Sequence, residues 1–510
     1  MTEARAGTAA LDFPPSCLQA MKSMDDSAVA LLDVIRSLAF VGDLAMGQPT
    51  DHSPRAAWMA GQLAREAGAD HATCTRATVV ALLRWSGCTA NAPEFAQLFG
   101  DDVSGRKALL AIQSPNSGFR SGTRNKGSAF LSLSRIHCEV SGDIAAQLGL
   151  DDETQFALHH LFESHDGTGA PDGLRGNQVP VAVYMASLAG DLEIFNRLYG
   201  VEQACRLIGE RADVLYPRDL ANVLLAHAQE WLSALDQDPT LSGPCSLDAT
   251  LAGRTTSLEI LAHVIDLKLP WMTGYSRDVA QLARRAARQL GLDEAGQKRV
   301  YRAALIHGMG RASVPNMVWD TPGRLAESAW ERVRLVPYWT GRAARQIGSL
   351  AGEAEVASYA YERPDGSGYF REVKEVSIPF EARILAAAAA LASLRAARPW
   401  REAYTEHAAN DMLKAEAAAG RYDVEIVRAL LDKPRSSGAR LQAMPSTGLL
   451  TEREREVLRC ISLGASNKQA AQKLSISPST VRTHIESVFR KLECSTRAAA
   501  TLKATQLGLL

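Results

Sequence analysis

Residues 449–510 contain basic and hydroxyl side chains of the types that recognise DNA. Arginine can donate two parallel hydrogen bonds to guanine, and Ser or Thr hydroxyls reach base edges or phosphates. This segment carries ten Lys or Arg against five Glu, whereas the whole chain has a net charge of -1. A local basic patch in a nearly neutral chain predicts a localised nucleic-acid interface, not attraction over the entire surface.

Start and stop signals divide this segment into four short helices. The start signals are two capping boxes, Thr451 with Glu454 and Ser466 with Gln469, and the N-cap pair Ser477-Pro478. Gly464 ends the first helix. Residues 475–477 separate the second and third helices, which is the length of the turn in a helix-turn-helix.

The third helix is predicted to lie in the major groove of DNA. Its apolar residues Val481, Ile485, Val488 and Leu492 repeat at helical spacing and form an inward face. The opposite face is then free for DNA, and Arg482 and Thr483 are expected to reach base edges. The complete set of predicted DNA-binding residues is Lys468, Ser479, Thr480, Arg482, Thr483, His484, Glu486, Arg490, Lys491 and Arg497. An amphipathic tail with solvated charges is the alternative.

The stretch TEREREVLRCISLGASNKQAAQKLSISPSTVRTHIESVFRKLECSTRAAA resembles the LuxR-type helix-turn-helix family. The resemblance implies four helices that bind double-stranded promoter DNA as a homodimer. It also implies that the fourth helix, Thr496–Leu507, pairs the two subunits. Glu486 departs from the residue that many relatives carry, so the preferred base sequence is left open.

An internal repeat occupies the chain before this segment. HDGTGAPDGLRGNQVPVAVYMASLAG (His165–Gly190) and PDGSGYFREVKEVSIPFEARILAAAA (Pro364–Ala389) share a DG[TS]G turn, a later Val-Pro or Ile-Pro, and an apolar helix. The repeat predicts a duplicated helical domain with a Gly-rich turn in each copy.

We expect an all-α chain with two helical bundles followed by the four-helix domain. Clusters of Pro, Gly and Ser give the boundaries. The expected parts are a loose tail (1–30), the first copy (31–235), a linker (236–254), the second copy (255–432), a flexible linker (433–448) and the DNA-binding domain (449–510).

The composition favours a cytoplasmic protein without a membrane partner. The eight cysteines form no CxxC pairs, which argues against a zinc site or a disulfide framework and fits a reducing compartment. The sequence contains no apolar run long enough to cross a bilayer.

The first 435 residues resemble a tandem HD-GYP-type region, a helical fold whose active members hold two or three metal ions and hydrolyse cyclic di-GMP. The resemblance is best in the second copy, in TGYSRDVAQLARRAARQLGLDE, ALIHGMGRASVPNMVWDTPGRL, ERPDGSGYFREV and IPFEARIL. The family's GYP turn reads Gly368-Tyr369-Phe370.

Most positions that hold metal in this family carry other residues here. In the second copy they are Tyr275, Gly308 after His307, Val336, Ala360-Tyr361 before Glu362, and Ala389, and the lysine that follows the His-Asp pair in the family reads Arg311. In the first copy they are Arg84-Trp85 and Leu161-Phe162 before Glu163, while His159, His160 and His165 have shifted spacing. We therefore predict no metal cofactor and no catalytic residues. Two interpretations are left open for His52, His137 and Asp191: they form a remnant metal site, or the histidines only make ordinary hydrogen bonds.

A ligand pocket at the Gly-rich turns is a further hypothesis, because the backbone N–H groups of these turns could face an anion. The candidate pocket residues are Arg175, Arg363, Asp365, Gly366, Gly368 and Tyr369. The favoured function is a DNA-binding transcription regulator whose degenerate region senses a small molecule or nucleotide, or serves as a scaffold. The alternatives are a metal-dependent cyclic di-GMP phosphodiesterase or phosphohydrolase fused to a DNA-binding domain, and a protein-interaction platform.

Overall fold

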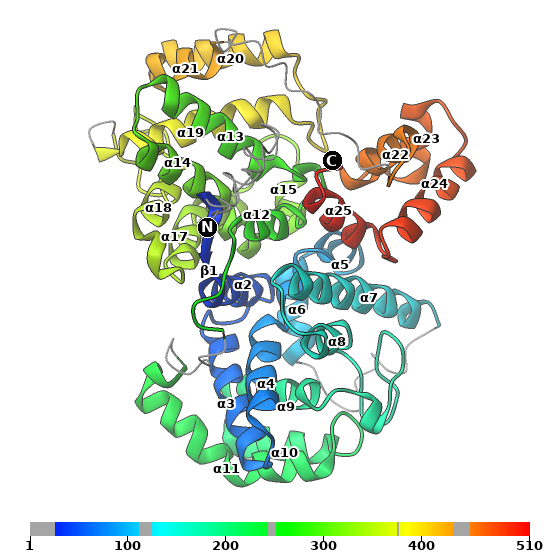
Figure 1. The fold of residues 1–510 in the computed structure, drawn as a ribbon. Coiled ribbons are helices and arrows are strands. Elements are labelled where there is room, and N and C mark those ends of the chain that lie inside the picture. The colour runs from blue at the N-terminus through cyan, green and yellow to red at the C-terminus, as the bar shows by residue number, and fades with distance from the viewer. Residues whose placement is uncertain (1–25, 112–123, 243–250, 375–376, 433–448) are drawn as a thin grey trace, which may run out of the picture.

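The fold is built from helices, as expected. The computed structural model describes residues 26–111, 124–242, 251–374, 377–432 and 449–510 (Figure 1). Within these ranges the sheet structure is limited to one two-stranded ribbon. The expected linker 433–448 and most of the expected tail lie outside the described residues.

The first copy contains a long series of helices and short 3-10 turns. They are α2 (Leu31–Ala45), α3 (His52–Glu66), α4 (His71–Leu83), η1 (Ser86–Cys88), α5 (Ala92–Phe99), α6 (Asp102–Ala111), α7 (Arg124–Gln147), α8 (Asp152–His159), η2 (Gly176–Gln178), α9 (Val181–Tyr199), α10 (Val201–Arg211), α11 (Arg218–Gln237) and η3 (Pro239–Ser242).

The second copy follows a similar order. Its elements are α12 (Glu259–Asp266), η5 (Pro270–Met272), α13 (Tyr275–Gln289), α14 (Glu294–Ile306), η6 (Met309–Ser313), α15 (Asn316–Trp319), α16 (Glu327–Arg334), α17 (Val336–Ala344), η7 (Gly348–Leu350), α18 (Ala351–Ala357), α19 (Phe380–Arg395), α20 (Glu406–Ala418) and α21 (Val424–Leu431).

The two copies repeat one packing pattern. Helix α3 packs against α4 and α9, and α13 packs in the same way against α14 and α19. A buried Asp fixes the start of the central helix in each copy. Asp43 accepts hydrogen bonds from the N–H and Oγ of Ser53 at 3.0 and 2.6 Å. Asp266 accepts the equivalent pair from Ser276 at 2.9 and 2.7 Å.

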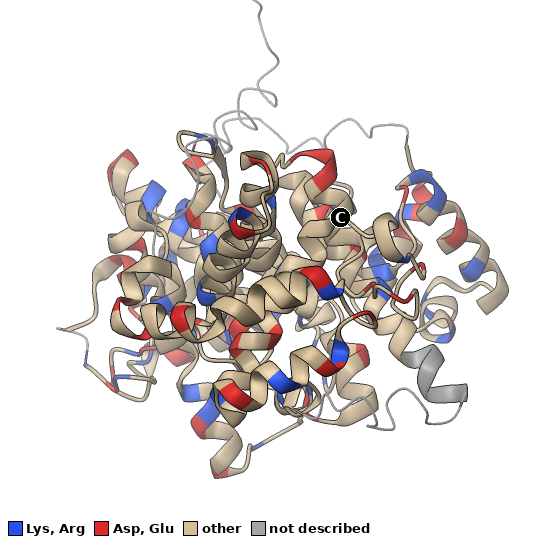
Figure 2. Ribbon diagram, turned by 90° about the horizontal axis from the view of Figure 1, so that it is seen from below, with Lys and Arg blue, Asp and Glu red and all other residues tan. Residues whose placement is uncertain are grey.

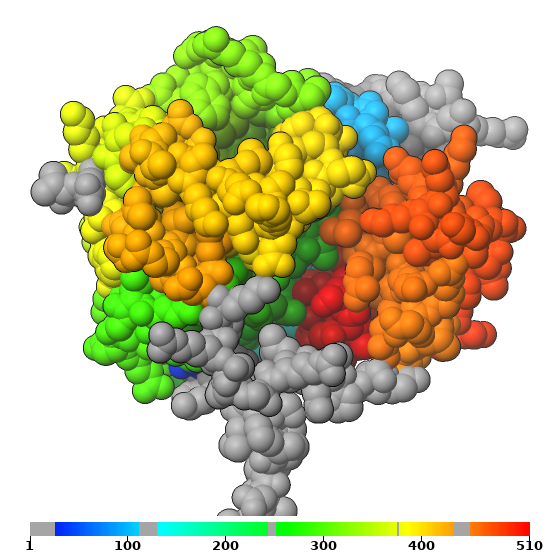
Figure 3. All heavy atoms as spheres, turned by 90° about the horizontal axis from the view of Figure 1, so that it is seen from above, coloured from blue at the N-terminus to red at the C-terminus, as the bar shows by residue number. Residues whose placement is uncertain are grey.

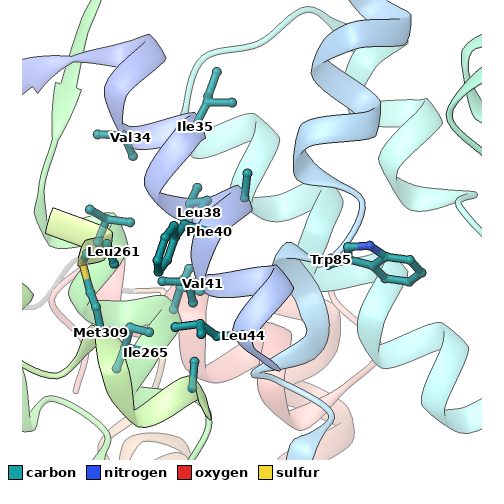
Figure 4. Close-up of a cluster of buried hydrophobic side chains, with 14 of the residues drawn as sticks. Val34, Ile35, Leu38, Phe40, Val41, Leu44, Trp85, Leu261, Ile265 and Met309 are labelled. Atoms are coloured by element: carbon teal, nitrogen blue, oxygen red, sulfur yellow. The ribbon is translucent and has the colours of Figure 1, made fainter. Parts of the chain in front are cut away.

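A shared apolar core joins the copies. Side chains of α2 such as Val41 and Leu44 belong to the same buried cluster as Ile265 of α12 and Met309 of η6 (Figure 4). Strand β1 (Ala28–Ala30) also pairs antiparallel with β2 (Thr255–Ser257), at the start of the second copy. The expected loose tail of residues 1–30 is therefore too long, because its last three residues are held by backbone hydrogen bonds.

A buried ionic cluster spans the same junction. The Lys268 Nζ of the second copy lies 2.7 Å from an Asp102 carboxylate oxygen of the first copy, and both side chains are fully buried. Arg106 also pairs with Asp102, at 3.3 Å. The backbone N–H of Asn316 donates to the other Asp102 oxygen at 2.7 Å. Charges buried in this way are stable only when they are paired, so the cluster fixes how the copies meet.

Candidate functional site

The C-terminal segment folds into the four helices that its capping signals predict: α22 (Glu452–Ser462), α23 (Asn467–Leu474), α24 (Pro478–Lys491) and α25 (Arg497–Gln506). Both capping boxes form, at Thr451 and at Ser466, and Ser477 caps α24 by accepting a hydrogen bond from the Thr480 backbone. Gly464 has a φ of +87° just after α22, a conformation that favours glycine. Residues 475–477 separate α23 from α24, as expected.

The two faces of α24 differ as the sequence predicts. Val481 and Val488 are fully buried in the core of the domain. The outward side chains that the sequence assigns to DNA are exposed at Ser479, Thr480, Arg482, Thr483, Glu486 and Arg490. The Nε of Arg482 donates to Glu486, one helical turn further along α24, at 2.9 Å. His484 is half-buried.

Three of the predicted DNA-binding residues differ in their surroundings. Lys468 is exposed near the start of α23. In contrast, Lys491 is paired with Glu454 of α22 at 2.6 Å. Burial raises the pKa of Glu454, but hydrogen bonds from Lys491 and Ser487 outweigh it and lower this pKa to about 2. Arg497 donates to the Ala465 carbonyl at 2.8 Å and joins α25 to the α22–α23 connection.

The centre of the first copy contains a buried arginine. The Nη1 of Arg84 donates to the Ala186 carbonyl at 2.9 Å, and a Cβ added at Gly190 would lie 2.9 Å from that nitrogen. Burial lowers the pKa of His52 and of His137 to about 3, reinforced chiefly by the positive charge of Arg84 at His52 and of Arg106 at His137. Both imidazoles are therefore neutral, and the Nε2 of His137 contacts the Arg84 carbonyl at 2.7 Å.

The second copy also has an arginine at its centre, but it comes from another position. Arg311 donates from Nη2 to the Nε2 of His307 at 3.0 Å and to the Tyr361 hydroxyl at 2.9 Å. A Cβ added at Gly308 would lie 2.6 Å from the Nη1 of Arg311. Because the Nδ1 of His307 contacts the Ala304 carbonyl at 2.5 Å, its Nε2 is left as the acceptor for Arg311. Burial lowers the pKa of His307 to about 3.

The Gly-rich turns have the same construction in both copies. Gly169 packs so closely on the Glu163–Ser164 backbone that a Cβ would meet it at 2.3 Å. Gly368 packs on the Glu362–Arg363 backbone, with the nearest atom at 2.4 Å. The two glutamates tie down the loops that follow, since Glu163 accepts from the Asp172 N–H at 2.7 Å and Glu362 accepts from the Arg371 N–H at 2.6 Å.

The residues of the expected ligand pocket are divided between different environments. The ring of Tyr369 stacks on Tyr361 with centroids 5.1 Å apart and faces the centre of the second copy. Asp365 is exposed and accepts from the Ser367 N–H within its own turn at 2.9 Å, while Gly366 has a φ of +83°. Arg363 stacks over the Tyr422 ring, and Arg175 is exposed on the equivalent turn of the first copy.

A metal centre needs several His, Cys, Asp or Glu side chains that converge on one point. Among the described residues, no three His, Cys, Asp or Glu side chains converge in a way that could hold a metal ion. This includes the remnant set, in which Asp191 lies 3.9 Å from Arg211 and also faces Arg84. The side chains at the two centres do not make a ligand set for a metal pair.

Sequence reasoning missed the buried acids Asp43 and Asp266, and the ionic cluster of Asp102, Lys268 and Arg106. A signal for the first pair was present, because each Asp precedes its Ser partner by ten residues, from 43 to 53 and from 266 to 276. No local pattern pointed to the second group, since its members come from different copies.

Comparisons with known proteins agree with this architecture. The structure superposes on a crystal structure of a cyclic GMP-AMP specific phosphodiesterase of Vibrio cholerae with a TM-score of 0.55 and 22% identity, over 79% of this chain and 97% of that one. The fold is therefore that of tandem helical domains of this kind.

Sequence families define the parts more closely. Residues 259–426 match the HD domain family, and residues 448–504 match the luxR family of bacterial regulatory proteins. The chain therefore carries an HD domain and a C-terminal LuxR-type helix-turn-helix domain, as its motifs predict. No described helix is long and apolar enough to span a membrane.

Individual relatives resemble either the front or the end of the chain. The 3'3'-cGAMP-specific phosphodiesterase 3 of Vibrio cholerae is 26% identical over 75% of this chain and 90% of its own length. The cyclic di-GMP phosphodiesterase response regulator RpfG of Xanthomonas campestris is 34% identical over 34% of this chain and 47% of its own. The probable transcriptional regulatory protein NarL of Mycobacterium tuberculosis is 44% identical over 14% of this chain and 33% of its own.

These relatives correct one expectation. The prediction that the chain has no metal cofactor is contradicted, because the HD domain and the phosphodiesterases similar to it belong to a metal-dependent class. A count of replaced positions in one sequence is insufficient for such a conclusion, since metals also accept carbonyl and water oxygens and ligands from shifted positions.

Proposed function

We propose that this chain is a transcription regulator that binds promoter DNA as a homodimer, with its tandem HD region acting as a sensor of a nucleotide-like effector or as a scaffold. The observation that supports it most directly is the exposed polar face of α24 above a buried Val481–Val488 stripe. In the view of Figure 2, Lys and Arg are interspersed with Asp and Glu along the helices of the chain. Such a regulator would act in the cytoplasm.

The test begins with DNA selected from random sequence by the full chain. Arg482→Ala is expected to cost about 1–3 kcal/mol of binding free energy at one base pair and to relax the preference there. Arg490→Ala should weaken binding to all sequences alike, as loss of a phosphate contact does. Lys414→Ala, which changes an exposed cation on α20, is the matched control and should leave affinity unchanged. Failure of the full chain to retard any duplex at low salt would refute the proposal.

A degenerate sensor is supported by the chemistry of the two centres. By the resemblance to the HD-GYP family, Arg84 stands at a metal-binding position and Arg311 stands at the position of a lysine, and both side chains are buried. In the second copy Arg311 and two tyrosines, Tyr361 and Tyr275, form the centre. Arginine and aromatic rings are also the groups that bind phosphates and bases. Titration of the full chain with 3'3'-cGAMP and cyclic di-GMP should therefore show binding to at least one of them.

A second candidate function is metal-dependent hydrolysis of a cyclic dinucleotide. It is favoured by the 26% identity to a 3'3'-cGAMP-specific phosphodiesterase over 75% of the chain. Elemental analysis of the purified chain and product analysis after incubation with Mn²⁺ and either dinucleotide separate the two. Turnover with bound metal would establish the enzyme, whereas binding without turnover would support the sensor.

A further inference from the structure

Helix α25 belongs to two apolar cores at once. Its residues Ala500 and Ala504 pack in the core of the DNA-binding domain. On another side, Ala499 and Leu502 pack in the large core that the two HD copies share. Leu502 is only 1% exposed, although it belongs to a surface helix of a small domain. The HD region therefore covers an apolar face that the DNA-binding domain would otherwise leave in water.

The surface of the HD region that covers Ala499 and Leu502 is called the seat of α25 below. Polar contacts with the first copy also hold α25 in this seat. The Nζ of Lys503 lies 3.2 Å from the Asp143 carboxylate of α7. The Ser495 hydroxyl, just before α25, donates to Glu139 at 3.1 Å, and the Ser495 N–H donates to the same carboxylate. Glu139 and Asp143 lie one helical turn apart on α7, so one face of this helix binds both the Ser495 donors and the Lys503 cation of the DNA-binding domain.

The second copy supplies the other side of the seat. The Thr273 hydroxyl donates to the Ser462 carbonyl at 2.8 Å, and Arg277 donates to the Thr505 carbonyl at 3.2 Å. Figure 3 shows α25 in red, recessed between the green second copy and the orange remainder of the DNA-binding domain. Both HD copies thus hold the same helix.

The DNA-reading helix is not held in this way. Helix α24 packs on α22 and α23, whereas α25 packs on α22, α7 and α12. In Figure 1, α24 lies on the outer side of the DNA-binding domain. The docked arrangement therefore leaves the base-contacting side chains exposed and covers α25.

We propose that this docking is an autoinhibitory contact, in which the HD region and a second copy of the DNA-binding domain compete for the same face of α25. The inference rests on the proposed homodimeric regulator and on the pairing of two DNA-binding domains through α25, which the LuxR-type resemblance implies. One side of α25 is committed to its own domain, so the Ala499–Leu502 face is the one available to a partner. While that face is docked, each chain presents a single recognition helix and cannot use two half-sites together.

The seat adjoins the centre of the second copy, which connects the docking to the proposed sensor. Asp266, which fixes Ser276 at the start of α13, also lines a small cavity with Thr273, Thr501 and Thr505. Asp266 also lies within electrostatic reach of Arg311. An effector that moves α12 or draws Arg311 away changes the wall against which α25 rests.

The experiment releases α25 without altering the DNA-binding domain. Two substitutions are made separately in the full chain: Glu139→Lys removes the acceptor of the Ser495 donors, and Asp143→Lys places a cation against Lys503. In sedimentation velocity each is expected to raise the dimer fraction above that of wild type. Each should also bind a duplex with an inverted repeat of the selected site roughly 10-fold more tightly or better, since two tethered half-sites then act together.

Three further variants control for misfolding and for charge. Adding Leu502→Glu to Glu139→Lys should abolish the dimer, because a carboxylate then lies on the pairing face. The charge swap Asp143→Lys with Lys503→Asp should return the chain to the wild-type state. Glu210→Lys, on the exposed surface of α10, should change nothing.

The outcomes separate this inference from the proposed function. Release variants that match wild type in both dimer fraction and affinity would overturn it, and so would a wild-type dimer that Leu502→Glu dissociates. If no form of the chain binds DNA, the proposed function fails, and the dimer fraction of the release variants still decides whether α25 is sequestered.

Discussion

The two HD copies hold nearly the same framework around chemically different centres. Each copy anchors its central helix with a buried Asp–Ser pair, Asp43 with Ser53 and Asp266 with Ser276. At the centre, Arg84 of the first copy donates to a backbone carbonyl. Arg311 of the second copy donates instead to a histidine and a tyrosine.

This difference shows which features a duplicated fold must keep. The framework consists of side-chain hydrogen bonds to the backbone that fix where helices begin and how loops run. The residues that make these bonds therefore recur at equal spacing in both copies. At the centre of a copy, the side chains need only fill the space and give each buried polar group a hydrogen-bond partner. A guanidinium enters from either position because a glycine opposite it, Gly190 or Gly308, leaves the space that a Cβ would occupy.

The largest expected effect concerns the junction of the two copies. Asp102→Ala leaves Lys268 and Arg106 without their shared carboxylate, and a buried charge without its partner is costly. We expect the free energy of unfolding to fall by about 3–5 kcal/mol in urea denaturation. Asp411→Ala, which breaks an exposed ion pair with His407, should cost less than about 0.5 kcal/mol. If the two losses are equal, the copies are not held together by this cluster.

Removal of the central arginine should destabilise the two copies by different amounts. Arg311→Met leaves the Tyr361 hydroxyl and the His307 Nε2 without their buried donor, so we expect a loss of about 2–4 kcal/mol of unfolding free energy. Arg84→Met should cost about 1–2 kcal/mol, because it removes one hydrogen bond to a carbonyl and one of the two positive charges near Asp191, which keeps Arg211. Thermal and urea denaturation of both variants measures the difference, and equal losses would show that the two centres are energetically alike.

The Gly-rich turns should respond equally, because their construction is shared. Gly169→Ala and Gly368→Ala each place a Cβ within 2.5 Å of backbone atoms that cannot easily move. We expect about 1–3 kcal/mol of destabilisation from each, read from the shift in denaturation midpoint. Gly348→Ala is the matched control, since a Cβ there meets nothing within 4 Å. A tolerated change in one copy alone would refute the equivalence of the turns.

The smallest expected effect is on the pH dependence of the unfolding free energy. It should be found at His52 and not at Tyr275, which occupies the corresponding position in the second copy. The pKa of His52 is about 3 when folded and about 6.5 when unfolded, so the unfolded chain binds more protons between these values. Stability from His52 therefore falls as pH drops below 6.5, by about 1–2 kcal/mol at pH 5. His52→Gln should remove that share of the pH dependence of unfolding, measured at pH 6.5 and 5.

Asp266 and Tyr275, at the centre of the second copy, affect the pH dependence of unfolding in different ways. Burial raises the pKa of Asp266 to about 7, so its contribution has the opposite sign and is lost as pH rises toward 7. Burial also raises the pKa of Tyr275 to about 12, far above the window. Tyr275→Phe should accordingly leave the pH dependence between 5 and 6.5 unchanged, and a change there would contradict the assignment to His52.

The sequence was sufficient for elements whose signals are local. Capping residues such as Thr451 and Ser477, and the spacing of Val481 and Val488, predicted the helices of the DNA-binding domain and their buried faces. Its outward side chains were also predicted, but Lys491 and Arg497 were not recognised as partners of Glu454 and Ala465. Those contacts join residues more than 30 positions apart, and no local pattern encodes them.

The metal question shows a different limit. The resemblance to the HD-GYP family implies that positions such as Gly308 and Tyr275 are replaced, but the conclusion drawn from them about cofactors was contradicted by the relatives. Which residues stand at a site is a property of the sequence. What the site binds depends on every donor that the fold brings within reach, including backbone atoms and water.

By itself, the order of residues determined the helices, the duplication and the exposed polar face of α24, because caps, periodicity and repeated turns act over short stretches of chain. Only the tertiary structure decided that Lys268 meets Asp102, that Arg84 and Arg311 fill equivalent centres, and that α25 rests against both copies. These are long-range contacts between elements that are each stable in outline without them, so burial and charge pairing in the assembled fold select them.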